Sequence, residues 1–149
     1  MIHYEKLEIN VSHLIKDSLI DFIMSNGSGE IWNYKTPPKD YPYNVVVSSK
    51  LDELTMPFLD YFKLKSAWIK TTCQLCGETY PIHKDVGYNG IRRYIFLQDQ
   101  SPGQFFNIDG KNIEWNEGDI YIWDDTIYHC SANAGIHPKI ALMVSGEKE

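Results

Sequence analysis

The sequence predicts a mainly β protein with flanking α-helices, built as a double-stranded β-helix (jelly roll). From residue 66 onward, short runs of β-branched and aromatic residues alternate with turn signals, which is typical of a sandwich or barrel. Two stretches of helical spacing precede residue 65. No repeat, low-complexity tract or linker interrupts the 149 residues. We therefore expect a single domain, residues 1–149, with helical and mixed support over 1–65 and a jelly-roll core over 66–146.

The expected helices lie in the first half of the chain. Asn10 or Ser12 can cap a helix that ends at Asn26-Gly27, and a second helix is expected over about 50–62, where Pro57 must kink it or mark its restart. The proline- and tyrosine-rich stretch 32–43 between them is expected to be irregular. It serves either as a lid facing the substrate or as a loop whose aromatic residues pack on the core.

The expected strands fill the second half. Asp109-Gly110 is a hairpin turn, and residues 116–119 supply another turn. The run 119–123 is apolar on both faces, as expected for a strand inside packed layers. The strands are expected at residues 67–72, 92–98, 104–108, 112–115, 119–123 and 139–145.

Composition narrows the class of function. A formal charge of -6, from 20 acidic and 14 basic residues, disfavours an extended nucleic-acid surface. No apolar run has the length of a signal peptide or membrane helix, so we expect a cytoplasmic monomer or homodimer without membrane contact. Three cysteines disfavour a disulfide framework. Cys73 and Cys76 form a C-x-x-C that is expected to be a loop, with metal binding or redox chemistry as alternatives.

A candidate metal site comes from His83, Asp85 and His129. In a strand, residues i and i+2 point to the same face, so His83 and Asp85 can reach one ion together. His129 closes the strand-like run 119–129. Two imidazoles and a carboxylate on one face of an octahedron leave three positions open, which suits Fe(II). Asp124 and Asp125 are expected to begin a turn, with hydrogen bonding near the site as the alternative.

On these residues, the chain resembles the iron(II)- and 2-oxoglutarate-dependent oxygenases, in particular the aspartyl/asparaginyl and prolyl hydroxylase-like branch, over roughly residues 66 to 146. The resemblance implies that His83, Asp85 and His129 bind iron and that Lys139 pairs with the far carboxylate of 2-oxoglutarate. It also implies that Arg92 helps to hold the other end of the co-substrate. Lys139 stands where the aspartyl/asparaginyl branch commonly has arginine; a lysine offers one point charge instead of a bidentate fork.

Strand alternation gives an independent expectation for these side chains. Arg92 and Tyr94 share a face, so Tyr94 is a further candidate co-substrate residue, and Arg93 points away unless a bulge exchanges the two faces. Arg92 is the favoured of the two arginines. If Lys139 faces the interior, the alternation also brings in residues 141, 143 and 145, whereas 140, 142 and 144 seal the opposite side.

The resemblance implies a dioxygenase that uses Fe(II), 2-oxoglutarate and O2, with ascorbate as a candidate reductant. It would release succinate and hydroxylate a C-H bond of a peptidyl Asp, Asn or Pro, or of a small molecule. The short chain favours an accessible cleft for a peptide side chain. Two other functions stay open: a cupin-like metal protein that is not an oxygenase, since the same ligands suit other divalent ions, and a silent jelly-roll module that binds a ligand.

Overall fold

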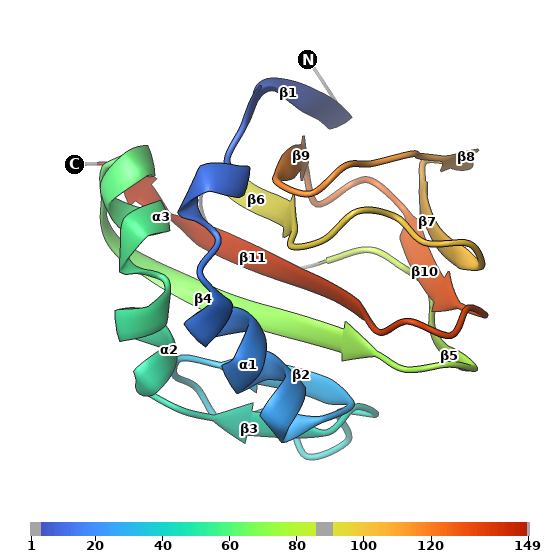
Figure 1. Ribbon diagram of the computed structural model, residues 1–149, viewed down its shortest axis with the longest axis horizontal. Helices are drawn as coiled ribbons and strands as arrows, with labels where there is room; N and C mark the ends of the chain where they lie inside the picture. Colours follow the sequence, from blue (N-terminus) through green and yellow to red (C-terminus); the bar gives the residue numbers. More distant parts are fainter. Residues whose placement is uncertain (1–3, 86–90, 149) are drawn as a thin grey trace.

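Two β-sheets and three α-helices make up the computed structural model, which describes residues 4–85 and 91–148 (Figure 1). The larger sheet has seven strands in the order β1-β9-β6-β11-β4-β2-β3, and the smaller sheet has four in the order β5-β10-β7-β8. The elements are β1 Tyr4–Asn10, the 3-10 turn η1 Ser12–Leu14, α1 Asp17–Asn26, β2 Gly29–Trp32, β3 Val45–Val47, α2 Lys50–Leu54, α3 Met56–Phe62, β4 Leu64–Gln74, β5 Glu78–His83, β6 Ile91–Phe96, β7 Gln104–Ile108, β8 Lys111–Asn112, β9 Asp119–Trp123, β10 His129–Asn133 and β11 Lys139–Lys148.

The elements form three layers. The helices lie against one face of the larger sheet, next to β4 and β11, and the smaller sheet faces the other side (Figure 1). All strand neighbours are antiparallel except β2 and β3. This is the mainly β, jelly-roll architecture expected from the sequence, with helices backing one sheet.

The larger sheet separates two hydrophobic cores. Because β11 is pleated, its side chains point alternately into one core and the other. Ile140, Leu142 and Val144 pack with the helices. Ala141 and Met143 pack in an aromatic cluster between the sheets. The alternation expected along this strand is thus confirmed. The aromatic cluster is the layer into which the candidate site opens.

The helical half differs from expectation at one boundary. The first helix ends at Asn26 with Gly27 at φ 71, as expected, but α1 begins only at Asp17. Asn10 does not cap it: its Oδ1 accepts the Ser12 backbone N–H at 2.9 Å, which forms a turn before η1. Pro57 lies in the first turn of α3, where it needs no N–H partner, so it marks a restart after α2.

The strand predictions are correct in part. The runs 104–108 and 119–123 agree with β7 and β9, whereas 112–115 yields only the two-residue β8 and 67–72 extends to the longer β4. Asp109 and Gly110 both have positive φ, at 53 and 80, and join β7 to β8 as the expected hairpin turn. Four strands were not expected: β1, β2, β3 and β10. A strand at His83 was expected, but β5 ends at His83, so the expectation that Asp85 belongs to it is wrong.

The structure also tests the expectations for the Cys73–Cys76 segment and for Asp124. Cys73 lies in β4 and is buried, while Cys76 is exposed, and both are free thiols; the expectation of a loop holds for Cys76 and is wrong for Cys73. Asp124 accepts the backbone N–H of Thr126 at 2.8 Å, which makes it a turn residue, as expected. Among the helices of the described residues, none is long and apolar enough to span a bilayer.

Candidate metal centre

His83 and His129 face each other across the pair β5–β10. His83 is the last residue of β5 and His129 the first of β10, and the two are register partners. His129 therefore opens a strand and does not close the run 119–129, because β9 stops at Trp123 and a turn follows. Asp85 lies two residues beyond the end of β5. The ligand atoms of His83, Asp85 and His129 all lie within 4.8 Å of one another.

A bulge in β5 aims both Tyr80 and His83 inward. Ser131 pairs with Tyr80 and His129 with His83, so two steps along β10 match three along β5. Pro81 lies inside this irregularity, where a missing N–H costs the ladder nothing. The extra residue changes the face of the strand, and His83 joins Tyr80 in the lining of one cavity.

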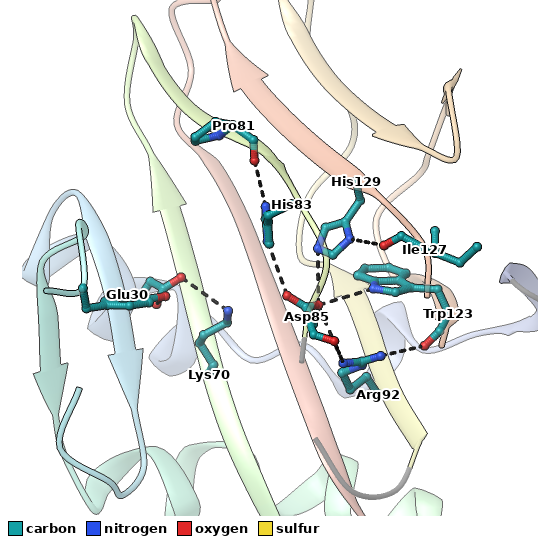
Figure 2. Close-up of polar contacts among 10 residues, drawn as sticks. Glu30, Lys70, Pro81, His83, Asp85, Arg92, Trp123, Ile127 and His129 are labelled. Atoms are coloured by element: carbon teal, nitrogen blue, oxygen red, sulfur yellow. Dashed lines mark hydrogen bonds and ion pairs between the residues drawn. The ribbon is translucent and has the colours of Figure 1, made fainter. Parts of the chain in front are cut away.

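The two imidazole rings are held in the same way. His83 Nδ1 lies 2.8 Å from the carbonyl oxygen of Pro81, and His129 Nδ1 lies 3.2 Å from that of Ile127. A carbonyl oxygen only accepts, so in each ring Nδ1 donates its hydrogen to the backbone and Nε2 is the nitrogen that faces Asp85. Both Nε2 atoms point to Asp85, at 3.3 Å from Oδ1 for His83 and 3.3 Å from Oδ2 for His129 (Figure 2).

Asp85 is held as an ionised carboxylate. Burial by itself raises its pKa, but the hydrogen bonds with His129 and His83 outweigh burial and hold the pKa of Asp85 well below its ordinary value. Its carboxylate in turn raises the pKa of His83. Trp123 Nε1 lies 3.4 Å from Oδ2, which adds a donor on the inner side. Metal coordination requires an ionised carboxylate and neutral imidazoles, and the donor set of two nitrogens and one carboxylate fits Fe(II).

Arg92 and Tyr94 both lie on the inner face of β6. The Arg92 guanidinium lies 3.9 Å from Asp85 Oδ2 and 3.3 Å from the Trp123 carbonyl oxygen, so it is beside the carboxylate of the candidate metal site (Figure 2). Arg93 points to the helical side, 5.0 Å from the ring of Phe62. Tyr94 is 6 % exposed and lines the cavity beside the triad.

Lys139 lies deeper in the same layer. It is 2 % exposed, and its Nζ lies 5.1 Å from the ring centroid of Phe106, 5.6 Å from that of Trp115 and 5.7 Å from that of Phe96. No carboxylate of the described residues forms an ion pair with it, and burial lowers the pKa of Lys139 to about 7. Phe106 stands between this lysine and the metal site, since its ring stacks on His129 at 6.3 Å.

Two connected spaces adjoin the triad. The inner cavity has a volume of about 30 Å³, and its walls include Thr72, Tyr80, Tyr94, Phe106 and Met143. The entrance cleft has a volume of about 470 Å³, and its outer wall comes from Tyr41 and Tyr43 of the loop 33–44. Lys70, Tyr80, His83 and Asp85 line both spaces.

Two interpretations of the loop 33–44 were left open by the sequence: a lid that faces the substrate, and a loop whose aromatic residues pack on the core. The structure has features of both. Tyr41 packs on Trp32 with 5.3 Å between ring centroids, and Tyr43 packs on Tyr80 at 4.2 Å. The same two tyrosines line the entrance cleft.

Sequence reasoning missed several residues of the site. Lys70 and Thr72 lie on β4 and Glu30 on β2, in segments where no site was expected, and Tyr80 lies on β5, three residues before the expected His83. One available signal was the alternation of Trp68, Lys70 and Thr72 with Ile69 and Thr71, because a lysine in the middle of a buried strand needs a partner. Nothing in the sequence near Glu30 indicated that it would be that partner.

Comparisons with known proteins agree with this geometry. Residues 62–149 match the Aspartyl/Asparaginyl beta-hydroxylase family, which is more than half of the chain. No curated protein matches the sequence significantly. In structure, the chain is similar to a Pseudomonas putida prolyl-4-hydroxylase, with TM-score 0.62 and 11 % identity over 99 % of this chain and 93 % of that one.

Two further solved structures are similar over nearly the whole chain. A viral collagen prolyl hydroxylase from Paramecium Bursaria Chlorella virus-1, solved as a 2OG complex, has TM-score 0.59 and 15 % identity over 99 % of this chain and 97 % of that one. An oxidoreductase of the 2OG-Fe(II) oxygenase family from Burkholderia pseudomallei has TM-score 0.55 and 14 % identity over 98 % and 88 %. At such identities the likeness shows the fold. The family match shows more, and on it the chain belongs to the aspartyl/asparaginyl β-hydroxylase family of 2-oxoglutarate-dependent hydroxylases.

Proposed function

We propose that the protein is an Fe(II)- and 2-oxoglutarate-dependent dioxygenase that hydroxylates a C-H bond of a peptidyl Asp, Asn or Pro or of a small molecule, with release of succinate. The observation that carries the proposal is the convergence of His83, Asp85 and His129, whose ligand atoms lie within 4.8 Å. When bound there, iron with 2-oxoglutarate and O2 supplies the oxidising chemistry. Ascorbate as a reductant stays a prediction.

The triad would hold the iron from one side. Nε2 of each histidine and one oxygen of Asp85 would coordinate the iron in place of the contacts that they now make with one another, because the Nδ1 atoms are held by backbone carbonyls. The opposite side faces the inner cavity and the entrance cleft. Arg92 and Trp123 would hold the Asp85 carboxylate in its orientation through the contacts at 3.9 and 3.4 Å.

Lys139 would bind the far carboxylate of 2-oxoglutarate. Supporting this role, its ammonium is buried without a carboxylate partner, and its neighbour in register, Gln74, has no hydrogen-bond partner for either side-chain amide atom. A dicarboxylate would supply the missing acceptors for both. The hydroxyl of Tyr80, also buried and unpartnered, is a further donor in the cavity wall.

The size of the inner cavity implies a side-chain movement on binding. About 30 Å³ holds one or two water molecules, far less than 2-oxoglutarate needs. Phe106 lines this cavity and also lies against Lys139. We therefore expect its ring to turn aside when the co-substrate reaches Lys139.

Anaerobic titration of the Fe(II)-loaded protein with 2-oxoglutarate tests the proposal. We expect the weak visible metal-to-ligand charge-transfer band in the native protein and its loss in His83→Ala. Lys139→Met should keep the band but require at least about tenfold more 2-oxoglutarate, because one charge-assisted contact is removed. His137→Ala, which changes a histidine outside the triad, is the matched control and should behave like the native protein. No band in the iron-loaded native protein would overturn the proposal.

The substrate class is tested separately. The open entrance cleft favours a substrate that inserts one side chain or one small molecule. Aerobic incubation with peptides that carry Asp, Asn or Pro, and with free amino acids, should give succinate together with a product that has gained one oxygen atom. Gain of oxygen only in free metabolites would exclude the peptide class.

A further inference from the structure

Lys70 places an ammonium group in the site outside the triad. It lies on β4 and lines both the inner cavity and the entrance cleft, with a side chain that is 13 % exposed. Figure 2 shows it between Glu30 and the group formed by His83 and Asp85. Lys70 shares the lining of both spaces with His83 and Asp85.

Glu30 is the group that holds Lys70 in place. Its carboxylate is buried, and Oε2 lies 3.4 Å from Lys70 Nζ. Oε1 accepts the indole N–H of Trp32 at 3.0 Å and the hydroxyl of Tyr41. With three donors already on its two oxygens and almost no exposed surface, Glu30 has little capacity left for a ligand.

Lys70 differs from Glu30 because its ammonium group has hydrogen-bond donors left for a ligand. An ammonium group has three N–H donors. Within the described parts of the chain, Glu30 is its one ion-pair partner, and the ring of Trp68 lies 5.8 Å from Nζ. The remaining donors adjoin the two spaces that Lys70 lines. A buried donor beside a cleft is stabilised by an acceptor that arrives with a ligand.

Lys70 and Lys139 occupy opposite ends of one sheet face. Lys70 pairs with Met143 and Gln74 with Lys139, so the two lysines are separated by four steps of β11, about 13 Å along the strand. Lys139 is at the inner end, behind Phe106, whereas Lys70 is at the end that opens to the cleft. A co-substrate that extends inward to Lys139 therefore leaves Lys70 for a second molecule.

The charge of the cleft favours an anion. Among residues 4–85 and 91–148, four charged residues line it: Glu30, Lys70, Lys84 and Asp85. Glu30 and Lys70 balance each other, and a divalent cation would more than neutralise Asp85. Lys84, exposed on the rim, adds a positive charge to the entrance. Without a metal these four side chains sum to zero, so the excess positive charge at the entrance would come from the bound cation, in a chain whose net charge is -6.

We propose that Lys70 is a specificity-determining residue that binds a carboxylate of the substrate, and that Glu30 is the positioning residue that holds Lys70. The hydroxylated molecule then carries a carboxylate close to the C-H bond that reacts. The inference rests on the proposed function for the identity of the reaction. Binding of an acid beside the metal can be measured without turnover.

Two matched probe pairs separate the sources of a carboxylate. N-acetyl-L-proline against N-acetyl-L-prolinamide tests a free α-carboxylate. A tripeptide Ala-Asp-Ala with blocked ends, against its Asn counterpart, tests a side-chain carboxylate. The protein is loaded with Mn(II) and saturated with 2-oxoglutarate, and broadening of the probe's proton signals by Mn(II) reports binding next to the metal.

We expect the acid of at least one pair to bind about tenfold or more tightly than its amide. Lys70→Met should abolish this preference, whereas Lys70→Arg should retain most of it. Glu30→Gln should weaken the preference without abolishing it, because the ammonium group of Lys70 remains but is no longer held in place by an ion pair. A purely structural ion pair predicts another pattern, in which both single variants lose stability and neither alters the ratio of acid to amide binding.

The remaining variants control for folding and for surface charge. Because Lys70→Met leaves Glu30 buried without its ion-pair partner, the double variant Glu30→Gln with Lys70→Met removes both charges together. Lys111→Met changes net charge by the same amount on exposed β8 and should leave the preference intact. Three outcomes would show that Lys70 does not bind a carboxylate of the substrate. Acids and amides bind alike in the native protein, no acid binds there, or the double variant keeps the preference. A missing Fe(II)-2-oxoglutarate band in the native protein is a separate result and contradicts the proposed function.

Discussion

The adjacent residues Arg92 and Arg93 show how much one strand position changes at the scale of a single residue. Both are buried, but Arg92 lies beside Asp85 and the aromatic layer, whereas Arg93 lies over Phe62 on the helical side. The pleat alone causes this difference. The two side chains therefore belong to different layers, and exchanging their roles would need a bulge in β6.

Because Lys139 is buried, we predict that the free energy of unfolding of the ligand-free protein depends on pH. Burial lowers its pKa from 10.5 to about 7, so between these values the unfolded chain binds more protons than the folded one. The free energy of unfolding should then rise as pH increases from about 7 to 10.5, by up to roughly 5 kcal/mol from this residue. Below about pH 7 both states are protonated, and the penalty for the buried charge is fully present.

Urea unfolding of the native protein and of Lys139→Met across pH 6–10 measures this effect. The variant should be the more stable one at pH 6, and the difference should shrink as pH increases. Other groups that titrate in this range are common to both proteins and cancel in the comparison. A difference that does not change with pH would mean that Lys139 keeps its proton in the folded state.

At the scale of elements, two glycines in turns allow the cost of backbone strain to be distinguished from the cost of a steric clash. Gly110 and Gly118 have similar φ values, 80 and 86. A Cβ on Gly110 meets nothing within 4 Å, whereas one on Gly118 would lie 2.3 Å from the backbone nitrogen of Ser12. Gly110→Ala should thus cost about 1–2 kcal/mol of stability, which is the strain of positive φ. Gly118→Ala should cost clearly more, because the segment before α1 must move as well.

Thermal unfolding of the two alanine variants under identical conditions provides the comparison. The Gly118 variant should also show faster amide hydrogen exchange at Val11, since the Gly118 carbonyl accepts the Val11 N–H at 2.9 Å. Equal losses of stability in the two variants would mean that the backbone near Ser12 yields without cost.

The elements that carry His83 and His129 were harder to predict than these candidate ligands themselves. β5 contains Pro81 and a bulge, so its period-two pattern is broken just before His83. β10 has the sequence His-Cys-Ser-Ala-Asn, which lacks large apolar residues, and it is stabilised as a strand by pairing with β5 and β7 on its two sides. Local propensity is weak in both segments, and tertiary pairing overrides it.

At the scale of the whole molecule, the larger sheet has a hydrophobic core on each face: one stabilises the fold, and the other surrounds the candidate site. The helical side contains aliphatic side chains, and the inner side contains aromatic residues around the triad and Lys139. Leu142 and Met143 are neighbours on β11 and are both buried, at 0 % and 3 % exposure, but they belong to opposite cores. Substitutions at these two positions should therefore separate stability from binding.

Leu142→Ala should destabilise the protein by about 2–5 kcal/mol and leave the 2-oxoglutarate titration unchanged, because its cavity opens toward the helices. Met143→Ala should raise the half-saturating concentration of 2-oxoglutarate several-fold, since Met143 lines the inner cavity. Denaturant unfolding and the anaerobic charge-transfer titration measure the two effects. Weakened 2-oxoglutarate binding in Leu142→Ala would show that the helical core and the site are coupled through the sheet.

The sequence by itself determined the fold class, the family and the candidate ligands His83, Asp85 and His129, together with the inward face of Lys139. Residue identity and strand alternation are local properties, and the chain displays them directly. Only the tertiary structure decided which distant segments meet. Glu30 comes within 3.4 Å of Lys70 because β2 pairs with β4, where Thr72 is the register partner of Glu30. His129 meets His83 because β10 pairs with β5. Such pairings depend on the burial of whole sheet faces, which no short stretch of sequence encodes.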